Sequence, residues 1–387
     1  MDTLEEMLSD LLDGAVETLD IAPYLYRLAV RCYEDVGTWL AERGKSDWRI
    51  YPQGSFLLGT VVRPHTPRGE YDIDLVCRLP VAKESTTQAK LKELIGDELF
   101  AFMQWKKQQG AADGPKGIDE RRRCWTLDYS GEGFHLDVLP TIPDVERPPT
   151  GILLTDKVLP QWQRSNPIGY AEWFKDRSEL TSYRIEAATK RHVNVADVPE
   201  WEIRTPLQRV VQILKWHTML RFANNPDNRP PSILITTLAA QAYEGERDLF
   251  TATSNVLSRM RDSIENRDGE WWVPNPAHKK ENFTDKWNEY PERREAFFRW
   301  HSDISSVLHD LIRMENKGLD IVAKRMSEGF APEPIMRSFE RMGERQRELR
   351  EAGNLHMAPT GRLTTAAAGP RVRGHGFFGQ HAADSRD

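Results

Sequence analysis

The chain has 387 residues, of which 39% are hydrophobic and 29% are charged, and its formal net charge is −6. This length exceeds what one hydrophobic core usually serves, so we expect two domains or one elongated, bilobal body. The acidic total excludes a general nucleic-acid binder, since such proteins carry excess positive charge, but it leaves room for a local basic groove.

Three features indicate a cytoplasmic protein that is not attached to a membrane. Cys32, Cys77 and Cys124 show no metal or redox spacing, which suits a reducing compartment without a disulfide framework. No apolar run of about 18 residues is present, so no transmembrane helix is expected. The acidic start, Met-Asp-Thr-Leu-Glu-Glu, lacks the basic residues that begin a signal peptide.

The first part of the chain begins with a helical pattern and then alternates turns, strands and helices. Residues 3–43 predict a helix that Pro23 divides into a short and a long segment. The following elements are expected in this order: a strand at 48–51, a Gly-Ser turn with a short helix to about residue 62, a loop at 63–70, a strand at 71–79, a helix at 88–104 and a loop at 108–119.

A hairpin is the next predicted element. Strands at 123–129 and 134–139 are joined by Ser130-Gly-Glu-Gly133, which has the composition of a hairpin turn. The proline-rich stretch 140–151 is expected to be irregular. A helix should begin after Asn166-Pro167, and it carries Trp173 and Phe174.

The second half predicts helices and no competing strand. Thr205-Pro-Leu-Gln208 combines an N-cap, a first-turn proline and a capping-box glutamine. Further helices are expected at 233–243, 251–265, 285–316 and 333–351. The tail from about residue 353 has little to bury and is expected to be disordered. The domain boundaries that we predict are 1–204 for N-terminal helices and a catalytic lobe, 205–351 for a helical lobe and 352–387 for the tail.

Two carboxylates stand out in the strand at 71–79. In a strand, residues i and i+2 point to the same face, so Asp72 and Asp74 project together. Two neighbouring carboxylates are costly unless a cation joins them. Magnesium meets this need, because it binds one or two carboxylates together with substrate phosphates. A solvated edge strand is the alternative, but the apolar neighbours Ile73, Leu75 and Val76 disfavour it.

A third carboxylate would complete a site for two metal ions. Asp137 lies in the second hairpin strand and shares a face with His135, for which a structural role is the default interpretation. In phosphoryl transfer, one metal arrives with the triphosphate and the other lowers the pKa of the attacking hydroxyl. Asp72 and Asp74 would bridge both metals, and Asp137 would lie beside the nucleophile as a candidate acceptor of its proton. Charge neutralisation and positioning then carry most of the rate.

The turn before these carboxylates could bind phosphate. Gly54-Ser55 precedes a predicted helix, and the N–H groups at a helix start favour anions. A plain turn with an N-cap serine is the alternative. With Asp72 and Asp74 nearby in the sequence, phosphate contact is the favoured interpretation.

These motifs together resemble the polymerase-β-like nucleotidyltransferases, and within them the bacterial cGAS/DncV-like nucleotidyltransferases (CD-NTases). The resemblance extends over about residues 25–345. The motifs that carry it are Gln53-Gly-Ser-x-x-x-Gly-Thr60, Asp72-x-Asp74 with the distant Asp137, Ser165 to Phe174, Thr205 to Lys215 and Ser232 to Ala240. The 16 residues between Ser55 and Asp72 exceed the superfamily's compact pattern, and the Pro64–Gly69 loop takes up the excess.

The resemblance implies an α+β fold. A polymerase-β-like lobe with a mixed β-sheet would pack on an all-helical lobe, and triphosphates would bind in the central cleft. Gln53, Gly54 and Ser55 would hold donor phosphates, while Lys215 and Ser232 would contact the triphosphate from the helical lobe. A lysine is a suitable point charge for phosphate, and Ser232 would stand at a positive helix end. Snorkelling of Lys215 and a simple capping role for Ser232 are the alternatives.

The resemblance also implies an activity and its partners. The enzyme would join two or three nucleotides into a ring, release pyrophosphate at each step and use two Mg²⁺ ions, with Mn²⁺ as an alternative. ATP would be a substrate, with GTP or another triphosphate as an additional one. In bacterial anti-phage signalling (CBASS) the product activates a separate effector. An ancillary regulatory protein could bind the tail, which holds the motif Gly374-His-Gly-Phe-Phe-Gly379.

Two other functions stay open from the sequence. One is a different transferase on the same fold, such as an RNA-tailing enzyme or one that adenylylates a small molecule or protein. The acidic charge and the absence of an obvious basic RNA-binding region disfavour tailing. The other is a non-catalytic nucleotide sensor, which the presence of all three aspartates disfavours.

Overall fold

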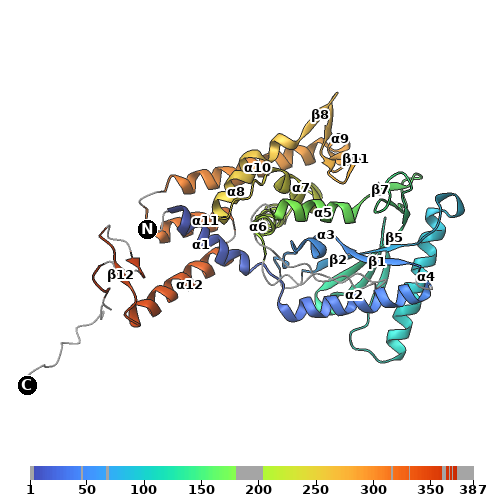
Figure 1. Ribbon diagram of the computed structural model, residues 1–387, viewed down its shortest axis with the longest axis horizontal. Helices are drawn as coiled ribbons and strands as arrows, with labels where there is room; N and C mark the ends of the chain where they lie inside the picture. The colour runs from blue at the N-terminus through green and yellow to red at the C-terminus, as the bar shows by residue number, and fades with distance from the viewer. Residues whose placement is uncertain are drawn as a thin grey trace, which may run out of the picture. The chain divides into compact units, whose positions relative to one another are not determined.

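The computed structural model describes residues 4–44, 47–66, 69–179, 204–314, 317–330, 332–359 and 363–372 apart from 366 and 368. The chain divides into two compact units, shown in Figure 1 by their residue colours. The larger unit holds residues 16–308, and the smaller unit holds residues 1–15 and 309–387. The predicted domain boundaries at 204/205 and 351/352 stay predictions. None of the described helices is both long and apolar enough to cross a bilayer.

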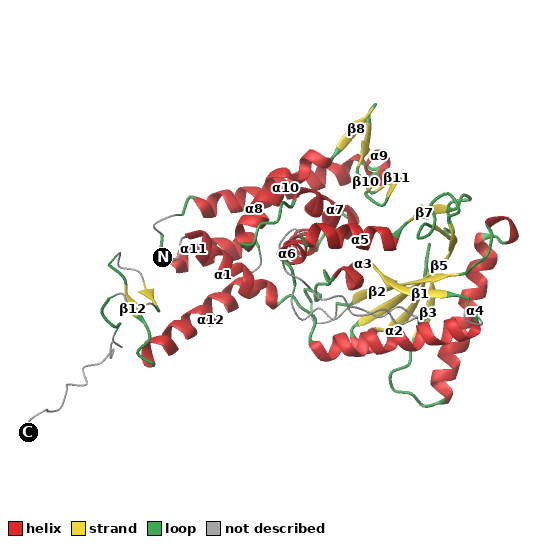
Figure 2. Cartoon of the chain, in the orientation of Figure 1, coloured by secondary structure: helices red, strands yellow, loops and turns green. Residues whose placement is uncertain are grey.

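A mixed sheet forms the centre of the larger unit. Among the described residues it has seven strands, in the order β1-β2-β5-β4-β3, with β6 paired to β5 and β7 to β6 (Figure 2). Strands β2 and β5 are parallel, and the other neighbours are antiparallel. The strands are β1 Arg49–Gln53, β2 Tyr71–Arg78, β3 Gly117–Glu120, β4 Trp125–Tyr129, β5 Phe134–Pro143, β6 Ile152–Leu154 and β7 Gln163–Ser165. The predicted mixed sheet and the β4–β5 hairpin are confirmed.

Two long helices cover one face of this sheet. Helix α2 (Pro23–Arg43) and helix α4 (Gln88–Gln108) bury apolar residues against alternate positions of the strands (Figure 1). The period of two in the strands sends every other side chain into this core. The remaining positions face the opposite side, and Asp72 and Asp74 are among them.

The helical part of the larger unit packs around α6, which carries the predicted capping box. The Thr205 hydroxyl accepts from the Gln208 N–H at 3.3 Å, and the Gln208 side chain accepts from the Thr205 N–H at 2.8 Å. Helix α6 packs against α5, α7 and α8. The helices are α5 Pro167–Ser178, α6 Pro206–Arg221, α7 Ser232–Ala242, α8 Leu249–Arg259, α9 Asp285–Glu289 and α10 Pro291–Ile312.

Prolines explain where several predicted helices divide. Helix α1 (Leu4–Glu17) is separate from α2, which begins at Pro23 as predicted. The single helix predicted at 285–316 is wrong, because Pro291 begins a new helix after α9. The helix predicted at 251–265 is α8, which starts at Leu249 and gives way to a 3₁₀ turn at Met260–Ser263.

The prediction of a second half without strands is wrong. Two small hairpins occur there: β8 (Glu265–Arg267) with β9 (Glu270–Trp272), and β10 (Pro274–Asn275) with β11 (His278–Asn282). Their strands have two to five residues, and only β8 is exposed throughout, so no apolar alternation long enough to predict a strand marks them. The sequence feature that could have predicted the β8–β9 hairpin is Asp268-Gly269. Its φ angles of 52° and 96° are those of a tight hairpin turn.

Three predictions in the first half also need correction. Strand β3 lies at the end of the loop predicted for 108–119, and β5 continues to Pro143 through the stretch expected to be irregular. Helix α3 is Gly54–Leu58 and ends well before residue 62, because Gly59 adopts a left-handed conformation there.

The smaller unit contains α11 (Leu319–Gly329) packed on α12 (Pro332–Glu351). Helix α12 was predicted closely, whereas α11 was not expected. The tail is not wholly irregular, since β12 (His356–Met357) pairs with β13 (Leu363–Thr364). The disorder predicted from residue 353 is therefore wrong for this hairpin. The motif Gly374–Gly379 lies outside the described residues.

A tight contact between α4 and the sheet provides a test of this packing. A Cβ at Gly96 would meet the Trp125 ring at 2.4 Å, and Trp125 Nε1 donates to the Lys92 carbonyl at 2.8 Å. Gly96→Ala therefore overpacks the core, and we expect a loss of about 1–3 kcal/mol in unfolding free energy. The measurement is chemical denaturation followed by tryptophan fluorescence.

The matched control is Gly343→Ala in α12. No heavy atom lies within 4 Å of a Cβ built there, so the added methyl group meets no neighbour. The change only reduces the conformational entropy that the residue loses when the helix forms. It should leave the protein unchanged or stabilise it by about 0.5–1 kcal/mol. Equal effects of the two substitutions would contradict the α4–sheet contact.

Candidate active site

The alternation of β2 separates its apolar residues from its carboxylates. Ile73 and Leu75 are fully buried in the core beneath α2 and α4. Asp72 and Asp74 therefore point to the opposite face, as predicted. Asp72 is exposed and Asp74 is half-buried, so this face is open to a ligand.

The parallel pairing of β2 with β5 brings the third carboxylate beside the first two. Asp74 lies opposite Asp137 in the register, and Asp72 lies opposite His135. Neighbouring strands are about 4.8 Å apart, so side chains at paired positions on one face are in reach of each other. The structure thus gathers Asp72, Asp74 and Asp137 on one patch of the sheet.

Poor hydration and neighbouring negative charge both act on the carboxylates of this patch. Poor hydration and then the charges of Asp137 and Asp72 raise the pKa of Asp74 to about 7. The same two causes, poor hydration and then Asp137, raise the pKa of Asp72, although the cations of Arg229 and Lys215 oppose the shift. The carboxylates therefore hold negative charge only at a cost, which a bound cation would remove.

Asp137 is fixed by the neighbouring strand. The Thr126 hydroxyl donates to its carboxylate at 2.6 Å, and Thr126 is its register partner on β4. Burial, followed by the charge of Asp137, raises the pKa of the Cys124 thiol to about 12. Sequence reasoning missed Thr126, although the hairpin register would have revealed it.

His135 has a structural contact, in keeping with its default interpretation. Its Nε2 lies 2.5 Å from the carboxylate of Glu70, the residue that precedes β2. This pair ties the start of β2 to β5 beside Asp72.

The predicted phosphate turn lies directly against the carboxylates. Gln53 is opposite Asp74 in the β1–β2 register, and half-buried Ser55 lies in the first turn of α3. Gly54 has a φ of 64°, and a Cβ added there would lie 2.3 Å from Oδ2 of Asp74. Glycine is required here for both reasons, since a side chain would need a strained backbone and would displace the carboxylate.

Lys215 reaches this patch from α6. It is 8% exposed, and its Nζ donates to the Thr60 carbonyl at 2.8 Å. Burial lowers its pKa to about 8, while the charges of Asp74 and Asp72 act in the opposite direction. An ammonium has three donors, so the bond to Thr60 leaves capacity for a phosphate oxygen.

Arg229, between α6 and α7, is a second cation near the patch, and Ser232 at the start of α7 is the last of the predicted site residues. Arg229 is exposed, and its charge acts on both Asp72 and Lys215. Sequence reasoning missed it, because a lone arginine in a proline-rich turn has no distinguishing pattern. Ser232 begins α7 as an exposed residue, and its carbonyl accepts from the Thr236 hydroxyl at 2.8 Å. Its phosphate contact stays a prediction.

The donor chemistry of the patch suits a hard divalent cation. Its ligands are carboxylate oxygens, which magnesium and manganese prefer. In the part of the chain that the structure describes, no three or more His, Cys, Asp or Glu side chains are grouped so that they could hold a metal ion by themselves. An incomplete oxygen set fits magnesium, which usually takes its other ligands from water and substrate phosphates.

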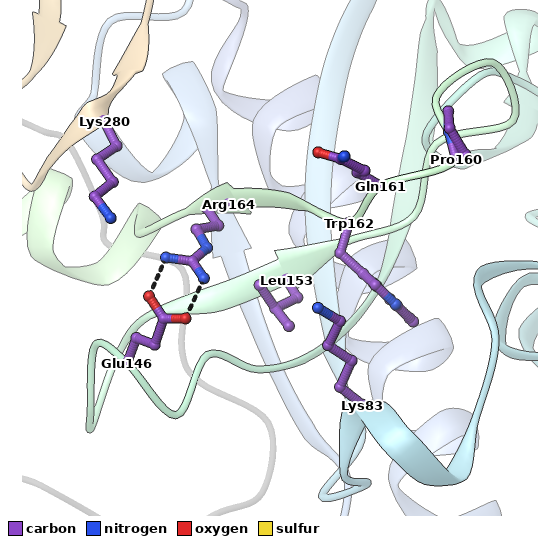
Figure 3. Close-up of a pocket in the computed structure, with 8 residues that line it drawn as sticks. All are labelled: Lys83, Glu146, Leu153, Pro160, Gln161, Trp162, Arg164 and Lys280. Atoms are coloured by element: carbon purple, nitrogen blue, oxygen red, sulfur yellow. Dashed lines mark hydrogen bonds and ion pairs between the residues drawn. The ribbon is translucent and has the colours of Figure 1, made fainter.

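A separate pocket lies at the β6–β7 end of the sheet. It has a volume of about 600 Å³, and Figure 3 shows Trp162 and Leu153 beside charged side chains. Arg164 and Glu146 form a two-pronged ion pair across it. None of the predicted site residues lines this pocket.

Comparison with known proteins agrees with this geometry. Residues 49–140 match the family model of the nucleotidyltransferase domain of the DncV-like cyclic GMP-AMP synthases. A c-di-GMP synthase of Roseivirga ehrenbergii is 30% identical over 358 residues, which cover 89% of this chain and 90% of that protein. The cyclic dinucleotide synthase CdnG of Bradyrhizobium diazoefficiens is 24% identical over 377 residues, covering 89% of this chain and 86% of that one.

A comparison of folds finds a similar solved structure. The structure of the Bradyrhizobium diazoefficiens CD-NTase CdnG in complex with GTP matches with a TM-score of 0.66 at 20% identity, covering 87% of this chain and 99% of that chain. The sequence match to the Roseivirga enzyme covers most of both chains. The chain therefore belongs to the bacterial CD-NTases and is a nucleotidyltransferase.

Proposed function

We propose that this nucleotidyltransferase joins two nucleoside triphosphates into a cyclic dinucleotide and releases pyrophosphate at each bond. The observation that carries the proposal is the register of β2 with β5, which places Asp74 beside Asp137 and next to Asp72. The names of both curated relatives, a c-di-GMP synthase and a cyclic dinucleotide synthase, support a ring of two nucleotides.

Two Mg²⁺ ions would be held by Asp72, Asp74 and Asp137, with Mn²⁺ as an alternative. When bound, they neutralise the triphosphate and lower the pKa of the attacking hydroxyl. Asp72 and Asp74 would hold both ions, and Asp137 would lie beside the attacking hydroxyl as the candidate acceptor of its proton. Thr126 holds the Asp137 carboxylate in place through its 2.6 Å hydrogen bond.

The chain's other polar groups position the triphosphate. The α3 turn offers the backbone N–H groups of Gly54 and Ser55, the Ser55 hydroxyl and the Gln53 side chain to the donor phosphates. Lys215 adds a point charge next to Asp74 and Asp72. Ser232 is the predicted contact from the start of α7. Fixed charges of this kind stabilise the transition state without reorganisation.

GTP is the substrate that the relatives favour. The 30% identical relative is named a c-di-GMP synthase, and the structure of CdnG contains GTP. ATP, which the resemblance implies, is the second candidate, and a mixed product would use both. The separate effector, the anti-phage role and an ancillary regulatory protein at the tail belong to the same proposal.

The competing transferase functions have weaker support. An RNA-tailing enzyme needs a basic track for its substrate, whereas this chain has a net charge of −6. Adenylylation of a small molecule or protein would use the same carboxylates, so the product alone separates it from ring formation. A sensor would not need the costly carboxylate patch.

The first prediction concerns the product. Purified protein incubated with GTP, ATP and Mg²⁺ should form a phosphatase-resistant dinucleotide, because ring closure leaves no terminal phosphate. Mass spectrometry identifies the bases and the ring size. A linear or protein-linked nucleotide in place of a ring would refute the proposal, and a cyclic trinucleotide would refute its ring size.

The double substitution Asp72→Asn with Asp74→Asn is the control for the site. It should lower turnover by at least about 10²–10³-fold, since the bridging charges are lost, and it should leave the fold intact. Circular dichroism and gel filtration check the fold. Turnover equal to wild type would remove these residues from the active site.

The second prediction concerns the contact between Gly54 and Asp74. Gly54→Ala places a methyl group where Oδ2 of Asp74 lies, 2.3 Å from the added carbon. We expect kcat/KM to fall about 10²-fold, because a shift of about 1 Å in a reacting group has that effect. Initial rates over a range of GTP concentrations provide the measurement.

Gly133→Ala separates this effect from backbone strain. Gly133 has a φ of 83°, similarly left-handed, but no heavy atom lies within 4 Å of an added Cβ. Both variants pay about 1–2 kcal/mol for the left-handed backbone. Only Gly54→Ala should lose activity beyond what its stability explains, and a matched loss in Gly133→Ala would argue against the contact.

A further inference from the structure

Four consecutive backbone carbonyls behind the phosphate turn accept hydrogen bonds from the start and one face of α6. The donors are Arg204 Nε to the Gly59 carbonyl at 3.0 Å, Gln208 Nε2 to the Leu58 carbonyl at 2.9 Å, Gln212 Nε2 to the Val61 carbonyl at 2.8 Å and Lys215 Nζ to the Thr60 carbonyl at 2.8 Å. Residues 208, 212 and 215 are spaced by four and three, so they form one ridge along the helix.

The ridge is buried and its glutamines are fixed in orientation. Gln212 is 0% exposed and Gln208 is 2% exposed. Gln212 Nε2 also donates to the Asp20 carboxylate at 2.9 Å, so both of its amide hydrogens have acceptors. Gln208 uses its oxygen for the Thr205 N–H and its nitrogen for the Leu58 carbonyl. Exchanging the oxygen and nitrogen of either amide group would break these hydrogen bonds, so each side chain has one orientation.

Helix α3 depends on these donors. It has five residues, Gly54–Leu58, and a helix this short has little stability of its own. The carbonyls at a helix end lack partners within the helix. Here α6 supplies the partners for Leu58, Gly59 and the two residues that follow.

The opposite end of α3 touches the metal-binding carboxylates. The Gly54 backbone leaves no room for a methyl group against Asp74, and the Thr60 N–H closes the turn onto the Ser55 carbonyl at 3.0 Å. A displacement of residues 58–61 is therefore transmitted to Gly54 and Ser55.

We infer that Gln208 and Gln212 are positioning residues that act on the triphosphate through α3. The identity of the ligand rests on the proposed function. They hold residues 58–61 by their carbonyls and so set the distance between the Gly54-Ser55 turn and Asp74. Lys215 belongs to the same ridge, and its charge interacts with those of Asp74 and Asp72.

Gln208→Glu is the sharpest test. Glutamate keeps the oxygen that accepts from the Thr205 N–H, as in a capping box, but replaces the donor that binds the Leu58 carbonyl with a second oxygen. We expect the Kd for a non-hydrolysable GTP analogue with Mg²⁺ to rise about tenfold, as for loss of one buried hydrogen bond. Isothermal titration calorimetry measures it.

Gln88→Glu is the matched control. Gln88 accepts from the Asp156 N–H with its oxygen and donates to the Leu159 and Pro160 carbonyls at 3.1 Å each, so it makes the same type of contacts far from α3 in the chain. It should lower the thermal midpoint without changing the Kd. Equal Kd values for Gln208→Glu and wild type, with a lowered midpoint in both variants, would overturn the inference.

A double-mutant cycle with Ser55→Ala tests the route of the effect. If Gln208 acts through α3, Ser55→Ala should weaken binding much less in the Gln208→Glu protein than in wild type. Additive losses would show that Gln208 acts elsewhere and would overturn the inference. Should Gln208→Glu fail to fold, Gln212→Glu takes its place in the same cycle, since Arg209 and Asp20 continue to surround it.

The binding readout separates this inference from the proposed function. A wild-type chain that binds the analogue but forms no cyclic product refutes ring synthesis and leaves the positioning role to be decided by the Kd values. A wild-type chain that binds no triphosphate refutes both.

Discussion

Repulsion among three carboxylates is the constraint around which this site is built. Parallel pairing forces Asp74 next to Asp137, and the period of two brings Asp72 to the same face. Poor hydration and, after it, the charges of Asp137 and Asp72 raise the pKa of Asp74 to about 7. In the proposed function a bound divalent cation would remove this repulsion, which the fold imposes before any ligand binds.

The surrounding elements keep this arrangement from relaxing. The β4–β5 hairpin supplies Thr126 to Asp137, and the Glu70–His135 pair fixes the entry of β2. On the other side, α6 holds residues 58–61 by their carbonyls, so the Gly54 turn cannot withdraw from Asp74. Each restraint comes from a different element, and the carboxylates are therefore fixed by tertiary contacts and not by their own strands alone.

Local patterns predicted the chemistry of the site better than its assembly. Asp72 and Asp74 were found because i and i+2 share a face, and Thr205 and Gln208 because a capping box has a fixed spacing. The pairing of Asp74 with Asp137 is non-local. In the sequence, Asp137 was a candidate only because a site for two metal ions needs a third carboxylate. The family resemblance supplied the mixed sheet and the expectation that Lys215 contacts the triphosphate, which stays a prediction.

Other parts lay beyond local reasoning for identifiable reasons. The second amide contact of Gln208, to Leu58, involves residues far apart in the chain, and Arg229 approaches Asp72 from an irregular turn. The hairpins β8–β9 and β10–β11 have strands of two to five residues, which are too short to show an apolar alternation. For Gln208 and Arg229, the residue that each one contacts or acts on is distant in sequence, so no local pattern points to it.

The parallel pairing of β2 and β5 also decides where this chain can change in length. The connection from β2 to β5 runs through α4, β3 and β4, yet the position of Asp137 beside Asp74 is set by the ladder between the two strands and not by the path that joins them. Insertions near residues 109–116, between α4 and β3, leave that ladder untouched. One residue gained or lost inside β5 would instead turn Asp137 toward the α2–α4 core. Related chains of different lengths should therefore be aligned with their gaps in the connection and none in the two strands, and the same connection is the natural place to insert a reporter domain.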